Sequence, residues 1–397
     1  MNQVLSDRVL NMSTSATLAM AAKTRELKAQ GKDVIGLSLG EPDFNIPEFI
    51  KEEAIQAIRD DYSSYPPVDG YADLKSAIIE KFKRDNHLDY KPEQIVVSTG
   101  AKQSLANVAM VLLNPGDEVI LPAPYWVSYA DIVKLAGGIP VEVPTSIDTD
   151  FKMTPEQLEA AITPKTKMLW YSSPCNPSGS VYSKEELEGL AAVLRKHPDI
   201  YIVSDEIYEH INFMGGGHVS IAGIEGMYDR TITVNGVSKA FAMTGWRIGY
   251  IGAPNWIARA CNKIQGQITS GANAIGQRAT IAALKAPVSK IQFMIDEFRK
   301  RRDMVLDLLN DIEGFKVNVP EGAFYVFPNI SHFFGKTLKG KTIENASDFA
   351  LYLLEEANVA TVTGEAFGNP DCIRISYAAS EKELREALRR IKEAVML

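Results

Sequence analysis

Short apolar runs alternate with amphipathic segments through the middle of the chain. The runs are rich in β-branched residues and lie at residues 95–98, 118–121, 167–171, 200–204 and 231–234. Between them, residues 104–113 and 184–196 repeat apolar positions at the spacing of a helix that buries one face. Strands that alternate with helices predict an α/β fold whose sheet is mostly parallel and covered by helices.

The pattern changes after residue 287. A long charged helix is expected over residues 288–309, and short strands follow at 325–327 and 373–375, with a last helix from Glu381. This order is typical of a smaller α+β domain. We therefore expect a large domain over residues 46–287 and a small domain over 288–397.

The N-terminal 45 residues differ from the large domain. They combine a polar arm with a helix near residues 19–30 and a strand at residues 34–38. We expect residues 1–45 to form an arm and to complete the small domain, rather than to join the central sheet.

Composition limits the kinds of partner. The 397 residues are 46% hydrophobic and 23% charged, as in ordinary soluble enzymes, and the net charge is −8. A negative chain disfavours nucleic acid and anionic membranes as main partners. Small molecules are the expected partners, and a phosphate on any of them must be held by local groups.

Neither a leader nor a metal site is expected. The first eight residues lack the apolar core of a signal peptide, and the longest apolar stretches have polar breaks. The three cysteines are far apart, which predicts reduced thiols in the cytoplasm: Cys175, Cys261 and Cys372. The five histidines show no metal-ligand spacing: His87, His197, His210, His218 and His332.

Unusual residues stand at four predicted strand ends, where open α/β sheets bind ligands. After residue 98, the small residues Thr99, Gly100 and Ala101 lead into a helix, with Lys102 beside them. Free N–H groups and the helix dipole suit a single phosphate there. The spacing is not that of a Walker loop, and a plain tight turn is the alternative.

Two further strand ends carry polar side chains. Asn176 stands between two prolines in residues 173–179, either as a ligand contact or as part of a structural turn. Asp205 ends an apolar run, and a buried carboxylate is costly without a partner such as a protonated pyridine nitrogen. Tyr208 follows three residues later. The alternative for Asp205 is a helix N-cap.

The fourth strand end carries a lysine that suits Schiff-base chemistry. Lys239 lies just beyond a small-residue turn, and Arg247 could be the nearby cation that helps its amine lose a proton. A surface lysine is the alternative. Together the four ends supply a phosphate cradle, a carboxylate, polar groups and an amine. This set matches pyridoxal 5′-phosphate (PLP).

Several motifs are specific in combination. They are Gly40-Glu41-Pro42-Asp43-Phe44, Tyr65 with Gly70, Asn176-Pro177-x-Gly179, Asp205-x-x-Tyr208, Ser238-Lys239, Gly245-Trp246-Arg247-Ile248-Gly249 and Arg374-Ile375-Ser376. On these motifs the chain resembles the fold type I PLP-dependent aminotransferases of class I/II, and most of all the bacterial Ib branch of aspartate aminotransferases. The resemblance runs from about Ser15 to the C-terminus.

The resemblance implies how the cofactor is held. Lys239 would form the internal aldimine and carry the proton, and Asp205 would pair with the ring nitrogen. Tyr208 and Asn176 would contact the ring oxygen, and Trp126 would stack on the ring. The phosphate would be held by Gly100, Ala101, Ser238 and Arg247, and by Tyr65 from the other subunit of a homodimer. The family often has a serine where this chain has Gly236, so Ser238 is expected to carry more of the phosphate contact.

The resemblance also implies the reaction. Arg374 would bind the substrate α-carboxylate, helped by Gly40, Asn176 and Trp126. Thr17 and Lys102 would favour a second carboxylate, although Lys102 could instead serve the phosphate. We therefore expect transfer of the amino group of L-aspartate to 2-oxoglutarate. The alternatives are an aromatic, alanine or prephenate aminotransferase, a β-lyase, or a non-catalytic binding protein of the same fold.

Overall fold

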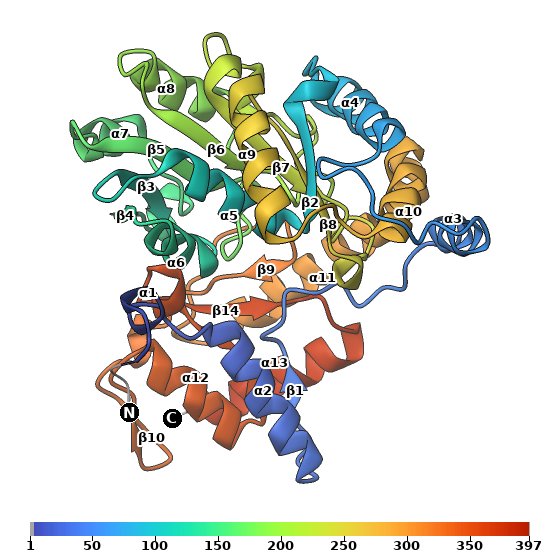
Figure 1. Ribbon diagram of the computed structural model, residues 1–397. Coiled ribbons are helices and arrows are strands. Elements are labelled where there is room, and N and C mark those ends of the chain that lie inside the picture. Colours follow the sequence, from blue (N-terminus) through green and yellow to red (C-terminus); the bar gives the residue numbers. More distant parts are fainter. Residues whose placement is uncertain (1–3, 397) are drawn as a thin grey trace.

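The computed structural model describes residues 4–396, and its centre is a seven-stranded sheet (Figure 1). The strand order is β2-β8-β7-β6-β5-β3-β4. The strands are β2 (Ile95–Thr99), β3 (Glu118–Ala123), β4 (Ile139–Pro144), β5 (Thr166–Ser172), β6 (Tyr201–Asp205), β7 (Thr231–Gly236) and β8 (Ile248–Gly252). All five strands predicted for this sheet are confirmed, each within two residues at either end. The α/β class is confirmed with them.

One strand of the sheet runs against the others. Strands β3 to β7 pair in parallel, whereas β8 is antiparallel to both β2 and β7. The carboxyl ends of β2, β5, β6 and β7 therefore share one edge of the sheet, and β8 starts from that edge. Neither β4 nor β8 was expected. β4 is an exposed edge strand with two prolines, and two of the five β8 residues are glycine.

Helices cover both faces of the sheet (Figure 1). On one face, α5, α6 and α9 enclose an apolar core with the side chains of residues such as Val119, Trp170 and Ile232. On the other face, α7 and α8 pack over Leu169 and Ile202, and α4 and α10 pack over Val97 and Tyr250. These helices are α4 (Ala72–Asn86), α5 (Ala101–Leu112), α6 (Ser128–Leu135), α7 (Pro155–Ala161), α8 (Lys184–Leu194), α9 (Asn255–Ile268) and α10 (Ala274–Lys285), and α3 (Glu48–Arg59) packs on α10.

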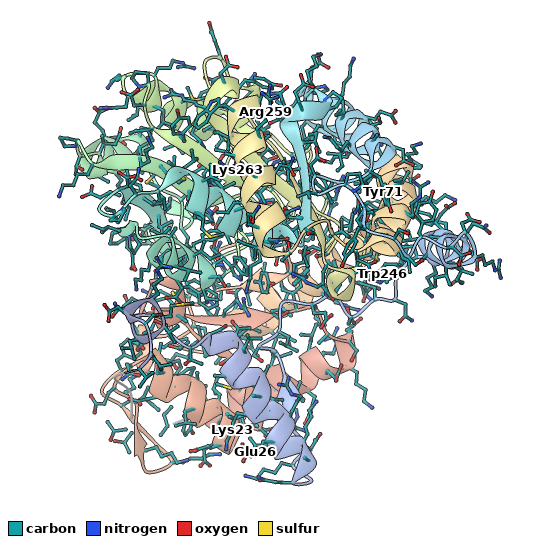
Figure 2. The ribbon with its side chains drawn as sticks, in the orientation of Figure 1. Lys23, Glu26, Tyr71, Trp246, Arg259 and Lys263 are labelled. Carbon is teal, nitrogen blue, oxygen red and sulfur yellow. The ribbon has the colours of Figure 1, made fainter. Side chains whose placement is uncertain are left out.

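The amphipathic pattern decides which side of each helix is buried. On α9, Ile257 and Cys261 are buried, whereas Arg259 and Lys263 are exposed and labelled on its outer side in Figure 2. On α2, Leu27 is buried, and the exposed Lys23 and Glu26, labelled in Figure 2, form an ion pair at 3.1 Å. Both helices thus turn buried apolar residues toward a core.

A second, smaller set of elements comes from both ends of the chain (Figure 1). β1 (Ile35–Gly36) pairs in parallel with β12 (Val359–Ala360), so the N-terminal segment joins the C-terminal part. β14 (Ile373–Ser376) lies between β13 (Val362–Thr363) and β9 (Tyr325–Val326), and β10 (Thr337–Leu338) pairs with β11 (Lys341–Thr342). The helices here are α1 (Asp7–Leu10), α2 (Ala16–Ala29), α11 (Gln292–Asn310), α12 (Ala346–Glu356) and α13 (Glu381–Val395). The domain boundaries after residues 45 and 287 stay a prediction.

The two helices predicted in the C-terminal part of the chain, α11 and α13, lie close to their expected positions. α13 begins at Glu381, where the Ser380 hydroxyl accepts from the N–H of Glu383 and the Glu383 carboxylate reaches back. α11 starts at Gln292, after a short 3₁₀ turn over Val288–Lys290 that the sequence pattern had included in the helix. Among residues 4–396, no helix is both long and apolar enough to span a membrane.

Candidate active site

A cavity of about 330 Å³ lies beside the carboxyl edge of the sheet. Residues from three parts of the chain enclose it: the strand ends, the N-terminal segment, and the paired strands β9 and β14. The predicted residues that line it are Thr17, Gly40, Ala101, Lys102, Trp126, Asn176, Asp205, Tyr208, Ser238, Lys239, Arg247 and Arg374. The fold therefore brings predicted residues that are up to 357 positions apart, from Thr17 to Arg374, into one cavity.

Lys239 projects into this cavity from the turn after β7. Its Nζ donates to the carbonyl oxygen of Gly40 over 2.6 Å. Burial lowers the pKa of Lys239 to about 8, and the guanidinium of Arg374 adds to the effect more than Arg247 does. The sequence had suggested Arg247 as the main neighbouring cation. A lysine with this pKa exchanges its proton readily near neutral pH.

Asp205 is buried at the end of β6 and faces the same cavity. The Tyr129 hydroxyl donates to its Oδ2 over 2.7 Å, and the Ile207 N–H donates to Oδ1 over 3.3 Å. Burial raises the pKa of the Asp205 carboxyl to about 6, against the opposing effect of Tyr129. None of the ion pairs within residues 4–396 includes Asp205. The helix N-cap alternative is wrong, because a turn and not a helix follows β6.

The predicted anion cradle lies where β2 passes into α5. Gly100 takes a φ of +78°, and a Cβ there would stand 2.3 Å from Nη2 of Arg247. A Cβ on Gly249 would stand 2.1 Å from the amide nitrogen of Ala101. The two glycines thus let Arg247 and β8 close against the first N–H groups of α5. Gly100 itself does not line the cavity.

The departure at Gly236 has a packing cause. Gly236 is paired in register with Gly249 across β7 and β8. A Cβ on Gly236 would stand 2.8 Å from the carbonyl oxygen of Ile248 and 3.0 Å from the Cα of Gly249. A serine at this position therefore requires a backbone shift, which leaves Ser238 as the hydroxyl beside the cradle.

Arg374 reaches the cavity from β14 and is almost fully buried. Its Nη1 donates to Oδ1 of Asn176 over 2.9 Å, and its Nη2 donates to the carbonyl oxygen of Ser38 over 2.5 Å. The guanidinium lies over the rings of Tyr325 and Phe367, at 4.6 and 4.9 Å from their centres. Its buried Nε has no hydrogen-bond partner within residues 4–396. A buried cation without a carboxylate suits an anionic ligand.

The two residues expected to bind a second carboxylate, Lys102 and Thr17, also line the cavity. Nζ of Lys102 lies 4.7 Å from the centre of the Trp126 ring. Burial lowers the pKa of Lys102, and the nearby Arg247 lowers it further. The Thr17 hydroxyl is buried and has no hydrogen-bond partner in the described part of the chain. Their roles toward a ligand stay predictions.

Besides Gly100, Tyr65 is the predicted site residue that does not line the cavity. It stands in the loop between α3 and α4, and its residue surface is 95% exposed. The base of the loop is fixed, because the N–H of Val97 donates to the carbonyl oxygen of Asp69 over 3.1 Å. The tyrosine therefore points away from a firmly held loop.

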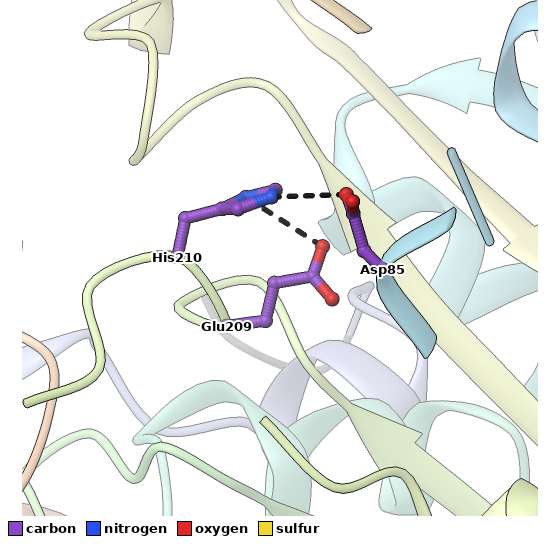
Figure 3. Close-up of side chains that lie close together, drawn as sticks. All are labelled: Asp85, Glu209 and His210. Atoms are coloured by element: carbon purple, nitrogen blue, oxygen red, sulfur yellow. Dashed lines mark hydrogen bonds and ion pairs between the residues drawn. The ribbon is translucent and has the colours of Figure 1, made fainter. Parts of the chain in front are cut away.

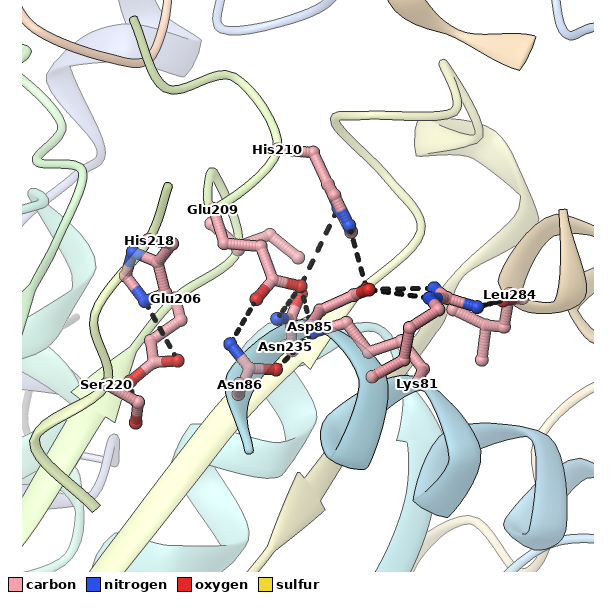
Figure 4. A network of polar contacts seen from close by, with 12 residues as sticks. Lys81, Asp85, Asn86, Glu206, Glu209, His210, His218, Ser220, Asn235 and Leu284 are labelled. Atoms are coloured by element: carbon pink, nitrogen blue, oxygen red, sulfur yellow. Dashed lines mark hydrogen bonds and ion pairs between the residues drawn. The ribbon is translucent and has the colours of Figure 1, made fainter. Parts of the chain in front are cut away.

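A buried ionic cluster surrounds Glu209 (Figures 3 and 4), which directly follows Tyr208 in the segment after β6. Lys81 forms an ion pair with Glu209, whose carboxylate also accepts from Asn86 and Asn235 over 2.8 Å each. Burial alone would raise the pKa of Glu209, but Lys81 and the nearby histidines lower it to about 2. The charged Glu209 thus ties the segment to α4 and β7.

Glu206 holds the other end of that segment. Its Oε1 accepts from Ser204 over 2.8 Å. The same oxygen accepts from Ser220 over 2.6 Å, and Oε2 lies 3.0 Å from Nε2 of His218 (Figure 4). His210 lies 3.2 Å from Asp85 in the same way (Figure 3). The spacing of the histidines in the sequence gave no sign of these contacts. The absence of a metal remains a prediction.

Sequence reasoning also missed two tyrosines. Tyr129 lies in α6 and was noted only as part of the Trp126 segment, and Tyr325 lies in β9 and was treated as an ordinary strand residue. The Tyr325 hydroxyl is 2.8 Å from the Tyr208 hydroxyl. Nothing in the local sequence distinguishes either residue from a core aromatic, since each acts on a partner far away in the chain.

The model of the family "Aminotransferase class I and II" matches residues 32–391. The chain belongs to this family. It is 50% identical over 390 residues to the aspartate/prephenate aminotransferase of Cereibacter sphaeroides, with 98% of each chain covered. It is 47% identical to the bifunctional aspartate aminotransferase and glutamate/aspartate-prephenate aminotransferase of Petunia hybrida, covering 99% of this chain and 83% of that protein.

Solved structures agree with the assignment to the class I and II aminotransferases. The aspartate aminotransferase of Rhizobium meliloti superposes with a TM-score of 0.95 at 46% identity, and 98% of each chain is covered. The Thermus thermophilus aspartate aminotransferase with maleate superposes with a TM-score of 0.93 at 42% identity. The match covers 99% of this chain and 100% of that one. The resemblance stated from the motifs is confirmed, and PLP is the cofactor that the family implies.

Proposed function

We propose that the protein is a PLP-dependent aminotransferase that moves the amino group of L-aspartate to 2-oxoglutarate, giving oxaloacetate and L-glutamate. The observation that carries this proposal is that one cavity is lined by Lys239, Asp205 and Arg374 and also by Lys102 and Thr17. The names of the relatives support aspartate as the amino donor. Maleate, present in the Thermus structure, is likewise a dicarboxylate.

The residues of the cavity fit PLP. The first N–H groups of α5 with Ser238 and Arg247 would hold the phosphate, because an anion is favoured at a helix N-terminus beside a guanidinium. Asp205 would hold the ring nitrogen: its buried carboxylate lacks a cationic partner among residues 4–396. Asn176 and Tyr208 would meet the ring oxygen, Trp126 the ring face, and Lys239 the aldehyde. When bound, PLP supplies an electron sink next to the substrate Cα.

The chain's own groups then have separate tasks. Arg374 binds the substrate α-carboxylate in a fork, with Asn176 and Ser38 fixing its plane. Lys239 would take the proton from the substrate Cα and return it at C4′ of the cofactor. Burial lowers the pKa of its free amine to about 8. Asp205 would keep the ring nitrogen protonated, since an adjacent carboxylate raises that nitrogen's pKa.

Prephenate is the second candidate amino acceptor. Two relatives that are 50% identical to this chain are named aspartate/prephenate aminotransferases. Prephenate also carries two carboxylates, so the cations Arg374 and Lys102 would serve both acceptors. An acceptor panel with aspartate as donor separates the two candidates: we expect turnover with 2-oxoglutarate, and turnover with prephenate identifies a dual enzyme.

A donor panel against 2-oxoglutarate tests the proposal itself. Aspartate should give the highest kcat/KM, above alanine, phenylalanine and tyrosine. A preference for an aromatic donor or alanine would replace the aspartate proposal. Release of ammonia and pyruvate in place of transfer would identify a β-lyase, and a coloured protein that turns over no donor would identify a binding protein.

Lys102→Ala should weaken aspartate more than it weakens monocarboxylic donors. The side chain is a cation at the cavity wall, and a charge-assisted contact to the second carboxylate is worth about tenfold or more in kcat/KM. The measurement is kcat/KM for aspartate and for alanine. Lys134→Ala, at an exposed position of α6, is the matched control and should change neither. An equal loss for both donors would assign Lys102 to the phosphate or to structure.

We also propose a homodimer whose active sites are shared. Tyr65 is 95% exposed on a fixed loop, and the apolar side chains of Val4, Leu5, Val9 and Leu10 are exposed in the N-terminal arm. An exposed aromatic residue and an apolar arm are suited to a two-fold interface. Tyr65 would then reach the phosphate held by the partner subunit.

Mixing two weakly active variants tests the shared site. Tyr65→Ala and Lys239→Ala subunits, allowed to exchange, should regain activity, because each heterodimer has one site with neither defect. Asp205→Ala mixed with Lys239→Ala is the control and should regain none, since both residues line one chain's cavity. Confirmed exchange by mass without recovered activity in the Tyr65 mixture would show that Tyr65 serves its own chain.

A further inference from the structure

Tyr325 is a cavity residue that has no role in the reaction as described so far. It lies in β9, which pairs with β14 so that Tyr325 faces Ser376 in register, two positions from Arg374. Its side chain is fully buried and lines the cavity with Lys239 and Arg374. A tyrosine hydroxyl in such a position needs a hydrogen-bond partner.

That partner is Tyr208, from the segment after β6. The two hydroxyl oxygens are 2.8 Å apart. Gly40 lies on the other side of the Tyr325 hydroxyl, so close that a Cβ on Gly40 would stand 2.2 Å from it. Because a phenol has one proton, either tyrosine can donate in this pair, but only one at a time. Donation by Tyr325 leaves the proton of Tyr208 for a ligand in the cavity.

The ring of Tyr325 has a second contact. The Arg374 guanidinium lies 4.6 Å from the ring centre, while Phe367 covers Arg374 at 4.9 Å. The aromatic face thus supports the cation that would bind the substrate carboxylate. One residue of β9 therefore contacts both the phenol expected at the cofactor and the guanidinium expected at the substrate.

We propose that Tyr325 is a positioning residue that donates its hydroxyl proton to Tyr208 and holds Arg374 on its ring. Tyr208 is thereby oriented with its own proton toward the ring oxygen of the cofactor. A hydrogen bond received by a phenol also strengthens the one that it donates. This proposal rests on the proposed function, because it assumes that Tyr208 meets the cofactor's ring oxygen.

The test of the hydroxyl is a pH titration of the visible absorption of the cofactor in the holoenzyme. A hydrogen bond to the ring oxygen withdraws electron density from the cofactor. This lowers the pKa of the nitrogen through which Lys239 is joined to the cofactor. In Tyr325→Phe, the midpoint pH of this titration should rise by about half a pH unit. This is the scale expected when one hydrogen bond strengthens a second hydrogen bond to the cofactor. Tyr208→Phe should raise it further. Tyr377→Phe is the matched control, since its buried hydroxyl bonds to the carbonyl oxygen of Ala323 over 3.1 Å.

The double variant Tyr208→Phe/Tyr325→Phe distinguishes coupling from an independent effect. Its midpoint should equal that of Tyr208→Phe alone, because Tyr325 acts only through Tyr208. An unshifted Tyr325→Phe, a shift equal to that of Tyr377→Phe, or an additive double variant would overturn the proposal. Thermal unfolding of each variant without cofactor verifies that the chain is folded.

A KM-against-kcat comparison tests the contact with Arg374. Tyr325→Leu removes the ring and should raise KM for the amino acid by about threefold or more, whereas Tyr325→Phe keeps the ring and should leave KM near its original value. Equal KM values in both variants would remove the arginine part of the proposal. A wild-type chain that never acquires cofactor absorption would instead overturn the proposed function, and this proposal with it.

Discussion

Lys239→Ala should abolish turnover while leaving the cofactor bound. Lys239 is placed as the proton carrier of the reaction, and its loss removes both covalent attachment and general acid–base catalysis, so kcat should fall by at least about 10⁴-fold. Binding persists because the phosphate and ring contacts come from other residues that line the cavity. The measurement combines steady-state kinetics with cofactor absorption after gel filtration.

Lys263→Ala is the matched control for Lys239→Ala. Lys263 lies on the exposed side of α9, away from the cavity (Figure 2), and its replacement should leave kcat unchanged. Partial rescue of Lys239→Ala by small primary amines would support a role in proton transfer. A Lys239→Ala enzyme with more than about one hundredth of normal kcat contradicts the assignment, because general acid–base groups contribute more than that.

Asp205→Ala should keep the fold and lose activity by about 10²-fold or more, the scale of losing a strong electrostatic contact at a reacting centre. Without the carboxylate the ring nitrogen loses its proton, and the electron sink fails. Tyr129→Phe keeps the carboxylate and removes only the 2.7 Å hydrogen bond to it, so its loss should be smaller. Near-normal turnover in Asp205→Ala would reduce Asp205 to a structural residue.

The raised pKa of Asp205 also predicts how the stability of the cofactor-free protein depends on pH. Burial raises that pKa from 3.8 to about 6 in the folded chain, so ionisation destabilises the cofactor-free protein as pH rises through this interval, and the cost is complete above pH 6. Asp205→Asn should therefore be at least as stable as the original chain at pH 8 without cofactor. Urea unfolding at pH 4 and at pH 8 measures the difference. A variant that is less stable at pH 8 contradicts the raised pKa.

The main residues of the site could be predicted from the sequence because each is marked by the short segment around it. Gly100, Asp205 and Lys239 each follow a recognisable apolar run, and parallel strands bring their carboxyl ends to one edge. Strand β8 escaped prediction because Gly249 and Gly252 contribute close packing and no apolar side chain: a Cβ on Gly252 would stand 2.4 Å from the Tyr90 ring.

The residues that support the site residues could not be predicted from the sequence, because their roles depend on contacts between distant segments. Tyr129 reaches Asp205 across 76 positions, and Tyr325 reaches Tyr208 across 117. The ion pair of Lys81 with Glu209 joins α4 to the segment after β6. Before folding, each of these residues resembles an ordinary core aromatic or surface charge. Only the packing of two parts of the chain gives them a partner.

Borohydride reduction of the yellow holoenzyme, followed by peptide mapping, tests the role of Lys239 most directly. Reduction makes the bond between cofactor and lysine permanent, and mass spectrometry then identifies the modified residue. We predict that a single peptide carries the cofactor and that the modified residue is Lys239. Modification of another lysine, such as Lys102 in the same cavity, or of none would contradict the mechanism proposed for this protein.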